Sequence, residues 1–523
     1  MNFAMNFEMI LNGNRDLKTI GIISIATVAL MGCGEKKSNH SVDDSSSQPT
    51  ITQGRENTQS ALGSNTAIQP PVAPLIPPSS PYVPGGVGKT IPPFIPIIPS
   101  IPIGPFGPHP ANGSAAAAST TVIHVPADYP TIQAAINAAS AGNTIQIAHG
   151  KYSENITINK PLILTGSGSG ASPKDTVINS AASSTPVITV TAGGTSDENR
   201  LVIRNLRVTG ASVDTANLGS GIRLTGAFSG FTTLRDIAVV SNSGNGIAFD
   251  LGSVAIEDIE IRESVVAYNG SSGISIPTGV SVDALRILGS HIDMNAAGLT
   301  GLGSSMTNWR FTSSTFNDNV GPNLPSTFGY GVALQGTTGL SQTVSNLSIE
   351  NSEFDRNRGT SATSNISAGL ELVIKTGDIY SGIFIKDSEF SKNGLDGITI
   401  NQVPMGILSD LRIDCSDFRE NAEAGIHAFD SGTLTDFTVC DSNFTDNLIA
   451  GIENFNSGFI DARFNWWNSS SGPFNSASNP NGRGDTVSGR IDFNPWLAEP
   501  VNRNCSRSNN IPVPIVPVIP LKK

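Results

Sequence analysis

The chain has 523 residues, a formal net charge of −12, and 54 glycines and 33 prolines against only 14% charged residues. This composition predicts many short strands joined by tight turns, with few helices. The acidic balance and the lack of a lysine/arginine run argue against nucleic acid as a partner, because nucleic-acid binding depends on neutralising phosphates. A strongly polyanionic sugar is disfavoured for the same reason, although a local basic groove is compatible with an acidic whole.

The N-terminus, residues 1–32, is predicted to be an export signal. Its apolar run Thr19–Leu30 follows Lys18 and is too short to span a bilayer. The run leads into Leu30-Met31-Gly32-Cys33, which resembles a bacterial lipobox. The resemblance implies cleavage before Cys33, a diacylglycerol anchor on its sulfur and, because Gly34 follows, placement in the outer membrane. A plain secretory signal with a chance cysteine is the alternative, and the periplasmic or surface orientation stays open.

Residues 33–120 are predicted to form a disordered Ser/Pro-rich stalk. Proline removes backbone donors and fixes φ, so a packed fold is not expected here. We expect instead a semi-rigid polyproline spacer between the membrane and the folded part. Residues 501–523 form a Pro-rich tail of the same kind. Recognition of the stalk as a PxxP ligand is the alternative.

The folded domain is predicted over residues 121–500. Near its start, apolar residues at helical spacing, Ile132, Ala135, Ile136 and Ala139, predict one short amphipathic helix. The stretches "TIQIA", "ENITI" and "LILTG" then read as short strands. This opening resembles that of right-handed parallel β-helix proteins, including pectin methylesterases and NosD-type periplasmic proteins. The resemblance implies a pectin-lyase-like (CASH-like) solenoid whose N-terminal end is plugged by the helix.

An internal repeat fills the rest of the domain. Each repeat has an apolar anchor at a strand end, Ser three residues later, an apolar residue, mostly Phe, five later and Asn eight later. The anchors are Ile261, Ile287, Phe311, Ile349, Ile385, Ile413 and Val439. A Gly-apolar pair, as at Gly425-Ile426, starts the next strand. The repeat predicts an all-β, right-handed, single-stranded parallel β-helix with three faces per coil.

Coils stacked about 4.8 Å apart place equivalent side chains in ladders. The Ser, the apolar residue at position +5 and the residue two before the anchor, Trp309 among them, are predicted to point inward. The Asn is expected in the turn because Asn accepts a left-handed backbone and its amide can bond the Asn of neighbouring coils.

The domain closes with residues 464–497, which resemble the "NWWG…SGP…PWL" segment of many bacterial β-helix surface proteins. Asn468 stands where that segment usually has Gly. Four aromatic residues are predicted to cover the last coil and protect its edge. They are Trp466, Trp467, Phe493 and Trp496.

Catalytic motifs of enzymes on this fold are missing. The pectin methylesterase stretches "QDTL", "DFIFG" and "GRPW", the polygalacturonase "NTD", "GHG" and "RIK", and the pectate lyase "WIDH" do not occur. The adjacent pair Asp43-Asp44 lies in the stalk. We therefore assign no catalytic residue, resident cofactor or metal, although lyases and epimerases on this fold are diverse enough to keep an enzyme as the alternative.

Two groups of residues are candidates for function. The first is an outward-facing row of acidic residues that stand four residues after the anchor of their repeat (position +4): Glu353, Glu389 and Asp417. Carboxylates stacked at about 5 Å raise one another's pKa, suit a retaining glycosidase or ligate Ca²⁺. Basic residues two or three positions on favour instead an exposed ion-pair ladder. These are Arg356, Lys392 and Arg419.

The second group lies on two long loops, Asn319–Gly331 and Asn357–Gly369, which belong to adjacent coils and should bulge side by side. Loops on a rigid solenoid are common recognition sites, and decoration without function is the alternative. The candidate ligand-contacting residues are Asn323, Phe328, Tyr330, Arg358, Ser364 and Asn365, with Phe328 and Tyr330 expected to stack on a pyranose ring.

Other chemically active residues are predicted to be structural. His124, His291 and His427 lie in strand contexts as surface or packed residues, and "RGD" at 483–485 is expected to be a turn. Besides Cys33, the cysteines Cys415, Cys440 and Cys505 allow one disulfide and require none.

The sequence thus predicts a lipid-anchored cell-envelope protein, without catalysis, that binds a glycan or a cell-surface partner or serves as an adhesin or structural element. A polysaccharide-active lyase, hydrolase or epimerase is the alternative.

Overall fold

The structure is a computed structural model, and it describes residues 121–182, 185–212, 219–250, 255–320, 329–359, 367–430 and 432–502. The signal peptide, Cys33, the stalk and nearly all of the tail lie outside the described residues, so the predictions for them stay predictions.

The described residues form a right-handed parallel β-helix, which confirms the predicted fold class. Its first sheet has 18 strands, and neighbouring strands pair parallel. These strands are β1 (Val122–Val125), β2 (Thr144–Ile147), β3 (Gly150–Ser153), β5 (Ile163–Thr165), β6 (Thr176–Asn179), β8 (Leu201–Thr209), β10 (Gly230–Val240), β12 (Ala255–Arg262), β13 (Val265–Ala267), β15 (Ser281–Leu288), β17 (Ser305–Thr307), β18 (Arg310–Thr312), β20 (Thr343–Glu350), β23 (Ile379–Lys386), β26 (Ile407–Asp414), β29 (Thr433–Cys440), β32 (Ile460–Asp461) and β35 (Ile491–Asp492).

A second parallel sheet has 13 strands and carries the candidate site described below. Its strands are β4 (Ile156–Ile158), β7 (Ile188–Val190), β9 (Ile222–Thr225), β11 (Ile247–Asp250), β14 (Ser272–Ile276), β16 (Ala297–Gly301), β19 (Val332–Gln335), β22 (Leu370–Ile374), β25 (Ile398–Gln402), β28 (Ala424–Asp430), β31 (Ala450–Asn454), β33 (Pro473–Phe474) and β34 (Gly484–Gly489).

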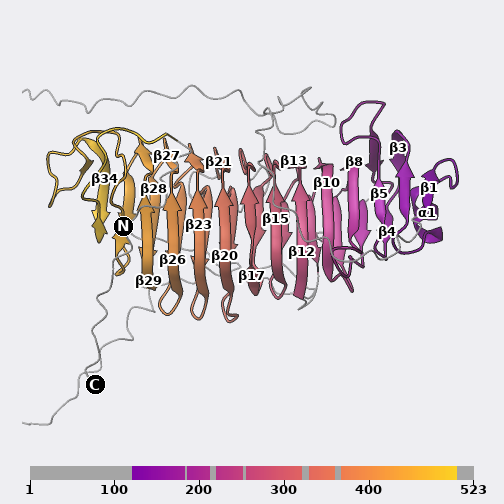
Figure 1. Cartoon of the computed structure of the whole chain (residues 1–523), viewed down its shortest axis with the longest axis horizontal. Coiled ribbons are helices and arrows are strands. Elements are labelled where there is room, and N and C mark those ends of the chain that lie inside the picture. Colours follow the sequence, from indigo (N-terminus) through magenta and orange to yellow (C-terminus); the bar gives the residue numbers. More distant parts are fainter. Residues whose placement is uncertain are drawn as a thin grey trace, which may run out of the picture. The chain divides into compact units, whose positions relative to one another are not determined.

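A third sheet has four short strands, β21 (Glu353–Asp355), β24 (Glu389–Ser391), β27 (Asp417–Arg419) and β30 (Asn443–Thr445). Single parallel bridges continue it toward the N-terminus through Thr315, His291 and Val265. There it meets the first sheet, because the long strands β8 and β10 run through both faces. Figure 1 shows the coils stacked side by side in chain order, from β1 to β34.

The core of the solenoid is built from ladders of equivalent side chains, as the repeat predicts. Every anchor residue and every residue two before an anchor is buried, including Trp309. The Phe ladder runs through Phe316, Phe354, Phe390, Phe418 and Phe444, with neighbouring ring centroids 4.7–5.2 Å apart and nearly parallel planes. Each stacked pair adds about 0.5–1.5 kcal/mol beyond the burial of its apolar area.

The asparagines form a continuous buried ladder. In each step the side-chain amide of one Asn donates to the carbonyl oxygen of the Asn one coil on, as from Asn357 to Asn393 at 3.1 Å and from Asn393 to Asn421 at 3.0 Å. The ladder starts one coil earlier than the sequence repeat suggests, at Asn242, and extends to Asn447. It fixes the register between coils.

Of the two reasons predicted for Asn in this turn, the amide bond to the neighbouring coil is confirmed and the left-handed backbone is wrong. The left-handed residue of this turn is the one before the Asn, as at Arg356, Lys392 and Glu420, where φ is 55°, 55° and 53°. The Asn itself is selected for its amide, which bonds to the neighbouring coil and to backbone, rather than for its backbone conformation.

Helix α1 (Ile132–Ala138) closes the N-terminal end, as predicted. Ile132 and Ile136 are fully buried, and the Thr131 hydroxyl accepts from a first-turn N–H. The Glu154 carboxylate accepts two further N–H groups at 2.9 and 3.0 Å, which satisfies donors that a helix start leaves open. No helix among the described ranges is long and apolar enough to cross a membrane.

The C-terminal end is closed by three of the four predicted aromatic side chains, Trp467, Phe493 and Trp496, whereas Trp466 is not part of the core cluster. Trp467 is buried and stacks on Phe444 with ring centroids 4.6 Å apart, and Phe493 is also buried. The "RGD" prediction needs correction, because Gly484 and Asp485 belong to β34 rather than to a turn. The Asp485 carboxylate accepts the side-chain amide of Asn447 at 2.8 Å and so ends the asparagine ladder.

The ladder predicts a stability effect. In Asn393→Ala, the side-chain donor and acceptor of one rung are lost and buried partners on both neighbouring coils stay unsatisfied, so the free energy of unfolding should fall by about 1–3 kcal/mol. Urea unfolding followed by circular dichroism measures it. The matched control Asn137→Ala, on the exposed side of α1, should change stability by less than about 0.5 kcal/mol; equal effects in both variants would contradict a structural role for the ladder.

Candidate functional site

An outward row of polar residues crosses the 13-stranded sheet. The register pairs Glu371 of β22 with Thr399 of β25, Thr399 with His427 of β28, and His427 with Glu453 of β31. The residues on either side of each in its strand point into the core, so by strand alternation this row faces away from it. Each member stands two residues after the glycine that opens its strand.

His427 lies at the centre of the row and is only 5% exposed. Its Nδ1 is 3.6 Å from Asp396 Oδ2, and its Nε2 is 3.7 Å from Glu453 Oε2. Neither ring nitrogen makes a hydrogen bond. The imidazole also packs against Phe429, with ring centroids 3.5 Å apart, and against Phe455 at 5.5 Å.

Two carboxylates reach the row from the turns before β25 and β28. Asp396 is 1% exposed, and its two oxygens accept the Ala424 N–H at 3.0 Å and the Thr399 hydroxyl at 2.7 Å. Glu423 is half-buried. Burial, and then the negative charges of Asp396 and Glu453, raise the pKa of Glu423, whereas His427 lowers it. One ligand-type atom each of Asp396, Glu423 and His427 lies within 4.8 Å of the others.

Glu371, at the other end of the row, is buried among polar partners. Its carboxylate accepts the Gln335 side-chain amide and is hydrogen-bonded to the Tyr330 hydroxyl. Burial raises the pKa of Glu371 to about 7, against the lowering effect of those two hydrogen bonds and of Lys375. A carboxyl with such a pKa can hold or give up a proton near neutral pH.

Of the six predicted loop residues, four lie outside the described residues, one is exposed and one, Tyr330, is buried. The four are Asn323, Phe328, Ser364 and Asn365. Arg358 is exposed and forms a parallel bridge with Val320.

Tyr330 requires a correction. It is 3% exposed and packs with Ala333 and Ala368, and its hydroxyl is engaged by Glu371. Its ring is therefore a packed part of the site and has no open face for a sugar.

The acidic row at position +4 has the predicted register, with Glu353 opposite Glu389 and Glu389 opposite Asp417. It is not the exposed ion-pair ladder that the sequence favours. Glu389 is buried and pairs with Arg419. Burial raises the pKa of Asp417, against its hydrogen bond from Asn443. The other two basic residues of the expected ladder pair elsewhere: Arg356 with Asp318 at 2.8 Å and Lys392 with Glu420 at 3.8 Å.

The sequence prediction missed the cluster around His427, because it treated the histidines as isolated. The available signal was the position two residues after each strand-opening glycine, where Glu371, Thr399, His427 and Glu453 follow one another in successive coils. Asp396 and Glu423 carry no such signal, since they stand one and two residues before their glycines.

The cysteines differ in state. Cys415 is in a disulfide, whereas Cys440 is free, so these two do not pair with each other. Burial, together with the neighbouring Asp414, raises the pKa of the Cys440 thiol to about 12. A thiol of this kind is a poor nucleophile and metal ligand.

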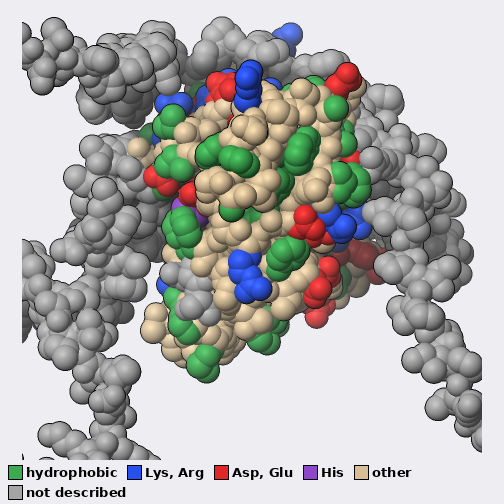
Figure 2. Space-filling model, turned by 90° about the vertical axis from the view of Figure 1, so that its left-hand side faces the viewer, with side chains coloured by type: hydrophobic (Ala, Val, Ile, Leu, Met, Phe, Trp, Pro, Cys, Tyr) green, Lys and Arg blue, Asp and Glu red, His purple; other side chains and the backbone are tan. Residues whose placement is uncertain are grey.

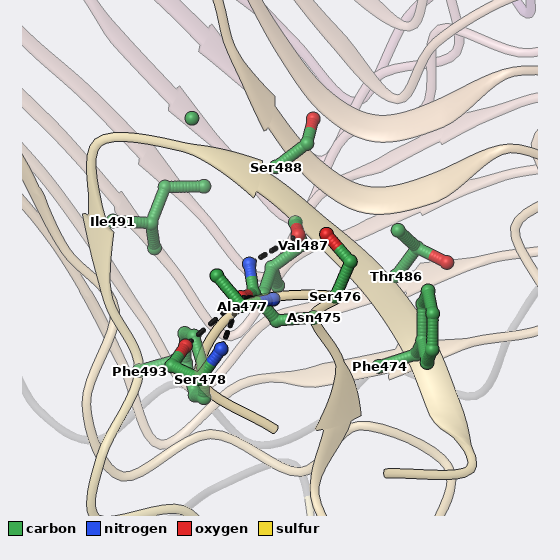
Figure 3. Close-up of a pocket in the computed structure, with 11 residues that line it drawn as sticks. Phe474, Asn475, Ser476, Ala477, Ser478, Thr486, Val487, Ser488, Ile491 and Phe493 are labelled. Atoms are coloured by element: carbon green, nitrogen blue, oxygen red, sulfur yellow. Dashed lines mark hydrogen bonds between the residues drawn. The ribbon is translucent and has the colours of Figure 1, made fainter. Parts of the chain in front are cut away.

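An open hollow of 420 Å³ lies on the C-terminal cap, lined by small and apolar residues that include Phe474, Val487 and Phe493. Figure 3 shows Asn475 between Val487 and Ser478; its amide donates to the Val487 carbonyl oxygen, and its side-chain oxygen accepts the Ser478 N–H. In Figure 2, which looks onto this end, hydrophobic side chains lie as separate small patches among polar atoms. The hollow has no charged lining residue, so the row around His427 is the stronger candidate.

Burial of Glu371 predicts a pH effect on stability. Because the folded-state pKa is raised from 4.5 to about 7, the native state binds the proton more tightly than the unfolded chain, and stability falls as pH rises through this window. Glu371→Gln should remove that fall, so at about pH 8 the free energy of unfolding of the variant should exceed that of the wild type by on the order of 2–3 kcal/mol. Urea midpoints across pH measure it. The control Glu257→Gln, at an exposed glutamate, should keep the wild-type slope; a wild-type slope in Glu371→Gln would contradict the assignment.

Several solved structures resemble this chain at low sequence identity. No protein-family model matches the sequence, and no curated protein matches it. Among solved structures, pectate lyase Pel9A is 14% identical, covers 74% of this chain and 82% of its own, and has a TM-score of 0.36. The A-module of the Azotobacter vinelandii mannuronan C-5 epimerase AlgE4 is 17% identical, covers 63% and 94%, and has a TM-score of 0.39. A GH87 α-1,3-glucanase catalytic domain is 14% identical, covers 65% and 67%, and has a TM-score of 0.36. At these identities the likeness concerns the fold alone, and the stacked parallel sheets of the described residues identify the chain as a right-handed parallel β-helix.

Proposed function

We propose that this protein is an envelope-anchored β-helix lipoprotein that binds a carbohydrate on the outward face of the 13-stranded sheet, beside His427. The observation that carries the proposal is Phe455. Its side chain is 60% exposed directly after β31, and its ring centroid is 6.4 Å from that of Phe429. A large exposed aromatic ring, packed beside the half-buried ring of Phe429 and next to a polar cluster, is typical of a binding surface.

The surroundings of these rings suit a sugar. The apolar faces of a pyranose can pack on Phe455 and Phe429, while hydroxyl groups need acceptors and donors nearby. Glu453 is half-buried beside His427, whose imidazole packs on both rings, and Asn401 pairs with Phe429 across β25 and β28. The carboxylates of the cluster and the net charge of −12 disfavour an anionic polymer, so a neutral glycan is the expected ligand.

Glycan binding is tested on an array and by calorimetry with the full chain. Phe455→Ala should weaken binding about tenfold, because it removes one ring platform. Phe384→Ala is the matched control, since Phe384 also faces outward but lies on β23 of the first sheet under Arg412, and it should leave binding unchanged. Binding that survives Phe455→Ala at full strength would overturn the proposed site.

The lipid anchor is the second part of the proposal and rests on the sequence around Cys33. Cys33→Ser removes the sulfur that would carry the diacylglycerol, so the variant should appear in the soluble fraction while the wild type sediments with membranes. Fractionation with immunoblotting measures this, and a variant that still sediments would contradict the anchor.

A polysaccharide-active enzyme is the second candidate, and Glu371 favours it. A buried carboxyl with a pKa of about 7, raised further by the nearby charge of Asp396, has the protonation state that a general acid needs. New reducing ends or unsaturated uronate products from a polysaccharide panel that disappear in Glu371→Gln would support this candidate. Products that disappear instead in Glu389→Gln and Asp417→Asn would place the chemistry on the third sheet.

A further inference from the structure

The cluster around His427 holds an excess of negative charge. The carboxylates of Asp396, Glu423 and Glu453 surround one imidazole, and within the described part of the chain none of the three has a lysine or arginine within 4.0 Å. Elsewhere on the solenoid, outward carboxylates commonly have such a partner, as Asp258 has in Arg286. The one basic side chain beside them in the described residues is His427, which is charged only when protonated, so a bound cation would balance the remaining negative charge.

His427 provides a second, independent observation. Both of its ring nitrogens are buried and neither is hydrogen-bonded. The distances of 3.6 and 3.7 Å to the flanking carboxylates exceed hydrogen-bond length. A buried polar atom without a partner is costly in free energy, and a bound ion or water is one of the explanations for it in native proteins. The imidazole is therefore spaced from its neighbours as a ligand is, rather than bonded to them.

We propose that His427 Nδ1, Asp396 and Glu423 bind a divalent metal ion. Ligand atoms bonded to one tetrahedral ion at about 2.1 Å lie roughly 3.4 Å apart, and His427 Nδ1 is 3.6 Å from Asp396 Oδ2. One ligand-type atom from each of the three residues lies within 4.8 Å of the other two, so a rotamer change of the half-buried Glu423 side chain would have to close the remaining distance. Solvent or a substrate oxygen would complete the coordination.

The neighbouring groups hold these ligands as a metal site requires. Thr399 donates to Asp396 Oδ2 at 2.7 Å and the Ala424 N–H donates to its other oxygen, which fixes the carboxylate. Glu453 faces Nε2, the nitrogen opposite the proposed metal. At 3.7 Å this carboxylate is beyond hydrogen-bond length, so it would have to approach Nε2 on metal binding to fix the tautomer that leaves Nδ1 free to coordinate.

The donor set indicates which ion. One imidazole nitrogen with two carboxylates suits Zn²⁺ or Mn²⁺, whereas Ca²⁺ takes six to eight oxygen ligands and Mg²⁺ prefers oxygen and water. Mn²⁺ is the better probe here, because it has little affinity for the free thiol of Cys440.

Binding is measured on the full chain after removal of bound metal with EDTA, by the loss of the free Mn²⁺ EPR signal and by calorimetry with Zn²⁺ and Ca²⁺. We expect one Mn²⁺ per chain, at least tenfold weaker binding in Glu423→Gln, and no binding in His427→Ala. Ca²⁺ should bind at least tenfold more weakly than Mn²⁺. Circular dichroism checks that each variant is folded, and Glu423→Gln changes only a half-buried side chain.

His291→Ala is the matched control. His291 also faces outward, with Nδ1 3.6 Å from an aspartate oxygen, but that nitrogen is hydrogen-bonded to Thr315 at 2.9 Å. This variant should bind Mn²⁺ as the wild type does. No Mn²⁺ bound by the wild type at millimolar concentration, binding unchanged in His427→Ala, or Ca²⁺ bound as tightly as Mn²⁺ would each overturn the proposal. Because no glycan is present, the result is separate from the test of carbohydrate binding.

Discussion

The buried asparagine ladder is the interaction on which the rest of this structure depends. Each amide binds the Asn one coil on, from Asn242 to Asn447, and Asp485 accepts the last donor. Inside the solenoid no water can satisfy these groups, so a slip of one coil against the next would leave a buried donor and acceptor unpaired. The ladder thereby holds residues at the same place in the repeat directly above one another.

Because of that register, residues at equivalent positions of successive repeats become neighbours on the surface and can form a site. Glu371, Thr399, His427 and Glu453 come from four separate coils, yet they become neighbours because the position after the opening Gly-apolar pair is the same in each. The turns, which differ from coil to coil, then add Asp396 and Glu423 to the row. A solenoid can thus build a site from residues more than fifty positions apart without a deep pocket, since the scaffold is rigid and repetitive.

The neighbourhood of His427 combines two features that serve different purposes. The aromatic rings of Phe429 and Phe455 offer an apolar surface, and the carboxylates offer charge. Placed side by side, a metal ion and a ring platform would orient a polyhydroxylated ligand from two directions. The buried Glu371, at the far end of the same row, is the group whose protonation changes near neutral pH.

Fold and core could be read from the sequence because both depend on periodicity. The anchor, Ser, Phe and Asn positions recur without interruption, and each predicted inward ladder is buried in the structure. The left-handed residue of the Asn turn was misplaced by one position, because the pattern shows only that a turn occurs and not which residue bends. Tyr330 was taken for an exposed platform since it follows a long loop, but the sheet buries it against Ala333 and Ala368.

The sequence by itself determined the solenoid, its two caps and which side chains point inward, because a short repeat with strict alternation leaves one way to bury its apolar residues. Only the tertiary structure decided that His427 lies among Asp396, Glu423 and Glu453. Those contacts join residues of the turns, which stand at different positions relative to the strand-opening glycine, to strand residues of other coils. Their distances depend on the backbone path of each turn, and the sequence repeat does not predict that path.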